Sequence, residues 1–171
     1  LASILQAGGK TFLGYVDDGS PRKHNPWESF PEGFSVERNF TNFPSSNFSL
    51  LPNVSFVIPN LNHDMHDGTI AQADQWLQGN LGAYAQWAVT HNSLLVVAWD
   101  EDDFLGTNQV PTILYGANLK PGQYAASYNH YDLLNTILSA NHLPAPNNAS
   151  SAAGIGDDVF GQSPAIPPRR R

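Results

Sequence analysis

The sequence predicts an α/β fold in which a mostly parallel sheet packs against helices. Short apolar runs at 11–16, 54–58 and 93–99 are bounded by polar residues or proline, as buried strands are. Segments with apolar residues at helical spacing alternate with these runs, a pattern typical of a layered, mainly parallel sheet. With 171 residues and no internal repeat, the chain fits one domain with a single core.

The helices follow from apolar spacing and from their end signals. Residues 1–7 have helical spacing and stop at a glycine pair. Thr69 is a suitable N-cap for a helix that runs to Leu81, and 84–89 form a second helical segment. The last predicted helix covers 131–138.

The remaining segments are a strand, a long loop and a tail. A strand is predicted at 110–115, where the internal proline favours an edge position or the strand's first residues. Residues 20–52 contain five prolines and no sustained period, and a loop of that length is usually functional. Residues 144–171 are rich in Pro, Asn and Ala and are predicted to be an irregular tail, which limits the domain to 1–143.

The long loop also carries several aromatic residues. They could line a substrate pocket, or they could form a minor core that holds the loop in place. These residues are Trp27, Phe30, Phe34, Phe40, Phe43 and Phe48.

Composition excludes some classes of function. The net charge is −7, so no basic surface is present to bind a nucleic-acid backbone. The chain has no cysteine, which excludes disulfides and thiolate metal sites. No apolar segment is long enough to span a membrane. A Gly-rich phosphate loop and a Gly-X-Ser-X-Gly elbow are both absent from the sequence.

Polar clusters follow three of the predicted strands. They are Asp17-Asp18, residues 60–68, and the four acids at 100–103. If the three strands are parallel, the clusters lie on one edge of the sheet, where open α/β sheets bind ligands.

The four acids after the strand at 93–99 indicate a cation. Carboxylates packed together repel one another unless a cation lies among them. We therefore predict that Asp100 and Glu101 hold a divalent metal ion and that Asp102 and Asp103 belong to the following turn. Oxygen ligands suit Mg²⁺, Ca²⁺ or Mn²⁺, and added histidine would also admit Fe or Zn, so the identity of the metal stays open. The alternative is a solvated turn.

The histidines are the other candidates for chemistry. His63 and His66 lie three residues apart with Asp64 between them, and such an acid can orient an imidazole or keep it protonated near neutral pH. The alternative is that both are turn residues with backbone hydrogen bonds. His24, in the long loop, is by default a surface residue, and His130 lies at a helix start, where it could contribute to a site.

Ordered motifs across the chain resemble those of a known family. They are Lys23-His24-Asn25-Pro26, Val54 to Pro59, His63 to Gly68, Asp74 to Leu77, Trp99 to Asp103, Asn108 to Pro111 and Asn129 to Leu134. The chain resembles the phosphoesterase family of bacterial and fungal acid phosphatases and phospholipases C from residue 1 to about 143. The resemblance implies an alkaline-phosphatase-like three-layer sandwich, metal-assisted hydrolysis of phosphate esters, and a secreted or periplasmic enzyme.

The resemblance also implies roles for individual residues. Asp100 and Glu101 match the family's acidic pair that binds the metal ion. His66, with Asp64 beside it, matches the histidine near the phosphate, and His24 and His130 match more variable positions.

The family's upstream Glu-Asn pair and its Ser or Thr nucleophile have no counterpart here. We therefore expect the chain to be the C-terminal part of such an enzyme, with a sheet incomplete at its N-terminal side and little turnover on its own. An N-terminal segment or another chain would complete the site, and Ser20, Ser29 and Ser55 are not assigned as the nucleophile. The alternatives are a non-catalytic module that keeps the fold, and a sulfatase or phosphonate hydrolase.

Overall fold

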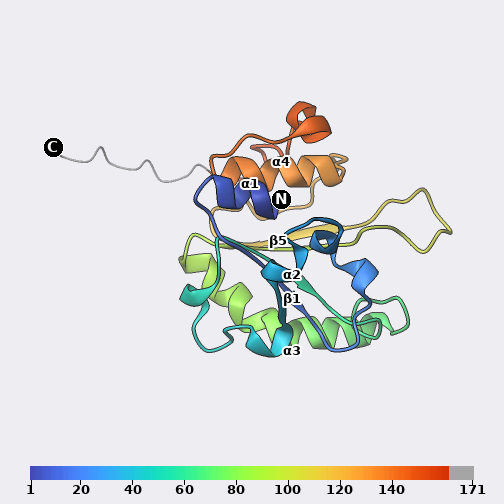
Figure 1. Ribbon diagram of the computed structural model, residues 1–171. Helices are drawn as coiled ribbons and strands as arrows, with labels where there is room; N and C mark the ends of the chain where they lie inside the picture. Colours follow the sequence, from blue (N-terminus) through green and yellow to red (C-terminus); the bar gives the residue numbers. More distant parts are fainter. Residues whose placement is uncertain (162–171) are drawn as a thin grey trace.

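The computed structural model describes residues 1–161, in which helices lie on both sides of two small sheets (Figure 1). The helices and strands are α1 (Ala2–Ala7), β1 (Phe12–Val16), α2 (Gly33–Val36), β2 (Glu37–Asn39), β3 (Val54–Ile58), α3 (Ile70–Thr90), β4 (Leu94–Ala98), β5 (Thr112–Gly116) and α4 (His130–Ala140). The loops also contain short 3₁₀ helices. The part of the predicted tail at 162–171 lies outside the described residues. No helix within residues 1–161 is both long and apolar enough to cross a bilayer.

A parallel three-stranded sheet, in the order β2-β1-β3, confirms the predicted α/β class. Central strand β1 pairs with both neighbours, so that Gly14 lies opposite Glu37 on one side and Phe56 on the other. The sequence did not predict β2, which is a short, mostly exposed strand inside the predicted loop. It has no apolar alternation, and its pairing with β1 is what makes it a strand.

The strand at 93–99 does not join this sheet, which corrects the expectation of three parallel strands. It forms β4, which pairs antiparallel with β5 in a separate two-stranded sheet, with Leu94 opposite Gly116. An apolar run indicates that a strand is at least partly buried, but it specifies neither the partner nor the direction. Pro111 immediately precedes β5, so its missing N–H lies outside the ladder.

Helix α3 is one continuous helix of 21 residues where two segments were predicted. It begins as expected with a capping box. The Gln72 amide donates to Thr69 Oγ1 over 3.2 Å, and Thr69 N donates to Gln72 Oε1 over 2.8 Å. Gly79 and Gly82 in its middle disfavour helix by up to about 1 kcal/mol each, which packing against β4 and β5 offsets.

Two apolar cores lie on the two faces of the parallel sheet. Phe12 belongs to the core with Leu5 of α1 and Leu138 of α4, whereas Tyr15 belongs to the core with Leu81 of α3. Residues of opposite parity on β1 therefore face different helix layers, as the two-residue period of a strand requires. Figure 1 shows α1 and α4 on one side and α3 on the other, which makes three layers.

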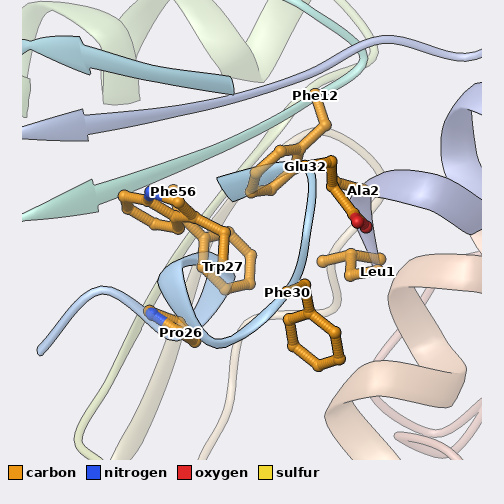
Figure 2. A pocket seen from close by; sticks show the side chains of 8 residues that line it. All are labelled: Leu1, Ala2, Phe12, Pro26, Trp27, Phe30, Glu32 and Phe56. Carbon is orange, nitrogen blue, oxygen red and sulfur yellow. The ribbon is translucent and has the colours of Figure 1, made fainter. Parts of the chain in front are cut away.

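The aromatic residues of the long loop divide between core and surface. Trp27, 4% exposed, packs over Gly14, where a Cβ would overlap the indole ring. Phe43 is also buried, whereas Phe34 is 72% exposed. Trp27 and Phe30 line a small apolar cleft of about 50 Å³ beside α1 (Figure 2). The loop is thus held mainly by a minor core.

Candidate functional site

The loops that follow β1 and β3 meet at one edge of the parallel sheet. Asp17 N donates to the Ile58 carbonyl over 2.9 Å, and Asn60 Nδ2 donates to the Asp18 carbonyl over 3.1 Å. Two of the three polar clusters predicted from the sequence are therefore brought together, because their strands are parallel neighbours.

The loop from Pro59 to Gly68 is tightly folded on itself. The amides of His63 and Asp64 both donate to the Asn60 carbonyl, over 2.8 and 3.0 Å. Glycine is required at position 68, because a Cβ there would overlap the Asn62 carbonyl oxygen. The loop therefore holds its polar side chains in one backbone arrangement.

Asp64 joins two histidines that are distant in sequence. Its Oδ2 lies 3.3 Å from His24 Nδ1, and its Oδ1 accepts a hydrogen bond of 2.8 Å from the His66 backbone amide. The two imidazole rings lie 6.0 Å apart between centroids. The side chains of His24 and Asp64 are only 21% and 19% exposed, whereas that of His66 is 56% exposed. We name His24, Asp64 and His66 the histidine cluster.

His24 is held in place by its neighbours in sequence. Asn25 and Trp27 are both buried, and each donates a side-chain hydrogen bond to Glu37 Oε2, over 3.1 and 2.8 Å. The His24 amide also donates to the Pro21 carbonyl over 2.9 Å. The default interpretation of His24 as a free surface residue therefore does not describe its environment.

The acidic residues after β4 lie in a different environment. Asp100 and Glu101 are exposed, and the Asp100 carbonyl accepts a hydrogen bond of 2.9 Å from His130 Nε2. Asp102 is a turn residue, as predicted, because its carboxylate accepts from the Phe104 and Asn108 amides over 2.9 and 2.7 Å. We name Asp100, Glu101 and His130 the acidic group.

No hydrogen bond or ion pair within residues 1–161 joins the histidine cluster to the acidic group. These residues also contain no cluster of three or more histidine, cysteine or acidic side chains able to hold a metal ion. The expected convergence of all three polar clusters is therefore seen for two of them, since β4 is not part of the parallel sheet.

His63 was considered from the sequence together with His66, but the family resemblance gave it no role of its own. Its Nδ1 lies 2.8 Å from Asp17 Oδ2, and its ring stacks on Trp76 with centroids 5.6 Å apart and planes 21° apart. His63 and His66 lie three residues apart in the same motif, so their spacing alone could not tell which of them pairs with the loop after β1. The acidic pair after β1 was the available signal.

The comparisons with known proteins agree with the family resemblance. The sequence profile of the phosphoesterase family matches residues 2–144. The chain is 47% identical to a phosphatidylinositol-3-phosphatase of Mycobacterium tuberculosis, over 92% of this chain and 57% of that protein. It is 27% identical to an acid phosphatase of Aspergillus fumigatus, over 82% of this chain and 34% of that protein.

A probable acid phosphatase of Kluyveromyces lactis is 29% identical over 72% of this chain and 32% of that protein. The chain thus spans between about a third and three fifths of the length of these relatives. No solved structure matches it. The match over residues 2–144, together with the 47% identity, shows that this chain belongs to the phosphoesterase family.

Proposed function

We propose that the chain carries the phosphate-binding part of a phosphoric ester hydrolase. Family membership and relatives named as phosphatases support this function. The observation that carries it is the histidine cluster, in which the Asp64 carboxylate contacts the His24 imidazole and the His66 backbone amide, and the two imidazole rings lie 6.0 Å apart.

The chemistry of the histidine cluster suits a phosphate ester. A protonated imidazole donates charge-assisted hydrogen bonds to phosphate oxygens and stabilises the charge that develops during phosphoryl transfer. Asp64 and Asp67 engage the Nδ1 atoms of His24 and His66, at 3.3 and 2.8 Å, so that Nε2 is the atom left for a ligand.

A divalent metal ion is a further part of the proposal. The carboxylates of Asp100 and Glu101 have the hard oxygen donors that such an ion prefers, and a bound ion would neutralise phosphate charge. Two ligands are too few, since Mg²⁺ or Ca²⁺ takes about six or more, and residues 1–161 contain no complete cluster. We infer that the remaining ligands and the nucleophile come from an N-terminal segment or another chain that completes the site.

The names of the relatives support a proposal for the substrate class. All three are named as phosphatases, one of them for a phosphorylated inositol lipid. These names favour a phosphomonoester over the diester that a phospholipase C would cleave. We also propose that the enzyme is secreted or periplasmic, as the family resemblance implies.

A binding experiment on the 171-residue chain tests the role of the histidine cluster. Inorganic phosphate is titrated while the imidazole resonances of His24 and His66 are followed by NMR at pH 6. We expect saturable shifts that are lost in His24→Asn and retained in the control His142→Asn, an exposed histidine elsewhere. Absence of saturable shifts in the unmodified chain would overturn the assignment and favour a non-catalytic module.

Hydrolysis by the complete protein tests the reaction class. A 4-nitrophenyl phosphate and the matching sulfate ester are compared side by side. We expect turnover of the phosphate ester and little of the sulfate ester. A preference for the sulfate would indicate a sulfatase instead.

A further inference from the structure

A polar depression of about 270 Å³ lies beside the loop that carries the histidine cluster. Its lining consists of His63, Gln72, Gln75 and Trp76. The volume is just below the range of about 300–1,000 Å³ that is usual for small-molecule sites, so it fits one ring-sized group.

The lining indicates a neutral, hydroxylated ligand. The carboxamides of Gln72 and Gln75 can each donate and accept hydrogen bonds, as can an imidazole, whereas Trp76 offers apolar ring surface. Among residues 1–161 no lysine or arginine lines the depression, so this part of the chain offers a phosphate group there none of the side chains that most often bind it. Hydroxyl groups on a carbon ring match both the amide groups and the ring surface.

His63 is fixed in an orientation suited to such a ligand. Asp17 engages its Nδ1 over 2.8 Å, which favours the tautomer with the proton on that nitrogen. Trp76 stacks against the imidazole, and Phe40 packs on Trp76 with centroids 5.3 Å apart. Within residues 1–161 no protein group bonds His63 Nε2, which is thus left to accept a hydrogen bond from a ligand hydroxyl.

The two glutamines have hydrogen-bonding capacity to spare. Gln72 Oε1 already accepts from the amide and the hydroxyl of Thr69, over 2.8 and 3.0 Å, so its NH₂ group is left to donate. Gln75 is exposed on the first turns of α3, and its side chain makes no hydrogen bond to another residue within 1–161.

The depression and the histidine cluster are linked through one backbone segment, because His63 lines the depression and Asp64 belongs to the cluster. His63 is followed directly by Asp64, and their amides share the Asn60 carbonyl as acceptor. We propose that His63, Gln75 and Trp76 bind the polyhydroxylated alcohol part of the substrate, a cyclitol or similar polyol, while the histidine cluster binds the phosphate. This inference rests on the proposed function and assigns specificity-determining residues to it.

Binding of an unphosphorylated polyol tests the subsite without requiring turnover. The probe is myo-inositol, titrated into the 171-residue chain while the Trp76 indole and the His63 ring are followed by NMR. We expect saturable shifts at millimolar concentration that weaken about fivefold in Gln75→Ala, as for one lost hydrogen bond. The matched control is Gln78→Ala, an exposed glutamine on the same helix outside the depression. Absence of saturable shifts, or equal weakening in both variants, would overturn the proposal.

Kinetics of the complete protein provide the second readout. The ratio of kcat/KM for a soluble inositol phosphate to that for 4-nitrophenyl phosphate is measured for each variant. We expect this ratio to fall about fivefold in Gln75→Ala and in His63→Asn, and to stay unchanged in Gln78→Ala. An unchanged ratio in the first two variants overturns the subsite and leaves the proposed function standing. If the unmodified protein hydrolyses neither ester, the proposed function fails, while the binding experiment still decides the subsite.

Discussion

The histidine cluster and the acidic group differ in how the fold supports them. His24 and Asp64 come from different loops, lie 3.3 Å apart between Nδ1 and Oδ2, and have largely buried side chains. Asp100 and Glu101 are exposed, and the one hydrogen bond from His130 reaches a backbone carbonyl rather than a carboxylate. The difference follows from the strands, because parallel pairing of β1 and β3 brings distant loops to one edge, whereas the β4–β5 hairpin joins residues near in sequence.

Residues 1–161 therefore hold one half of the proposed site, the histidine cluster, firmly in place and leave the other half, the acidic group, open to solvent. An exposed carboxylate pair is suited to receive further ligands from another segment. The projecting loop between β4 and β5, in yellow in Figure 1, is also exposed to solvent, since Phe104 and Leu105 are 79% and 89% exposed.

The largest expected effect tests the acidic group and its proposed metal ligands. Asp100→Ala and Glu101→Ala should each lower hydrolysis of 4-nitrophenyl phosphate by the complete protein more than about 100-fold, because each removes a proposed metal ligand. Asp103→Ala, in the adjacent turn, is the control and should have little effect. Full activity in Asp100→Ala would show that the acidic group is only a solvated turn.

The second-largest expected effect tests the histidine cluster. His66→Asn should lower kcat about 100-fold, the usual loss for one donor to developing charge, and should leave the free energy of unfolding almost unchanged because the ring is half exposed. His142→Asn serves again as the control. A variant that keeps its kcat but unfolds more easily would mean that His66 is a structural residue.

Gly68 tests how firmly the loop behind the histidine cluster is held. Gly68→Ala should lower the free energy of unfolding by about 1–3 kcal/mol in urea titration, because the added Cβ overlaps the Asn62 carbonyl and forces the loop to move. The matched control is Gly79→Ala in α3, where nothing lies near the added Cβ. That change should raise stability by up to about 1 kcal/mol. Equal effects of the two changes would mean that the loop tolerates rearrangement.

The sequence predicted the positions of the strands better than their pairing and order in the sheets. The apolar runs at 11–16 and 54–58 predicted β1 and β3 correctly, and parallel pairing then brought Asp17 and His63 together. The same reasoning was wrong for the pairing of 93–99, since periodicity measures burial and contains no information on strand order. The capping signal at Thr69 located the start of α3, but nothing local to 82–84 could show that packing would keep the helix continuous.

The site was predictable to a similar extent. Motif order singled out His24 and His66, and the structure gives them a shared partner in Asp64. Asn25 and Trp27, which hold His24 in place, both donate hydrogen bonds to Glu37 in β2. The sequence could not predict these contacts, because β2 has no apolar alternation that would mark it as a strand. Contacts of that kind arise only from the tertiary fold.

The smallest effect tests how β4 is fastened to the rest of the molecule. The Tyr84 hydroxyl of α3 donates to the Leu94 carbonyl at the start of β4 over 3.3 Å, and burial raises the pKa of this phenol. Unfolded tyrosine ionises near pH 10, so the stabilisation is fully present below that pH and is lost as the pH rises through the higher folded pKa. Tyr84→Phe should therefore lower the free energy of unfolding by about 0.5–1.5 kcal/mol at pH 7 and reduce its decline above pH 10. Urea titrations of both proteins at pH 7, 9 and 11 measure the two effects, and parallel curves for the two proteins would mean that this phenol is not buried in solution. In that case the hairpin, like the acidic group at its end, would be only loosely attached to α3.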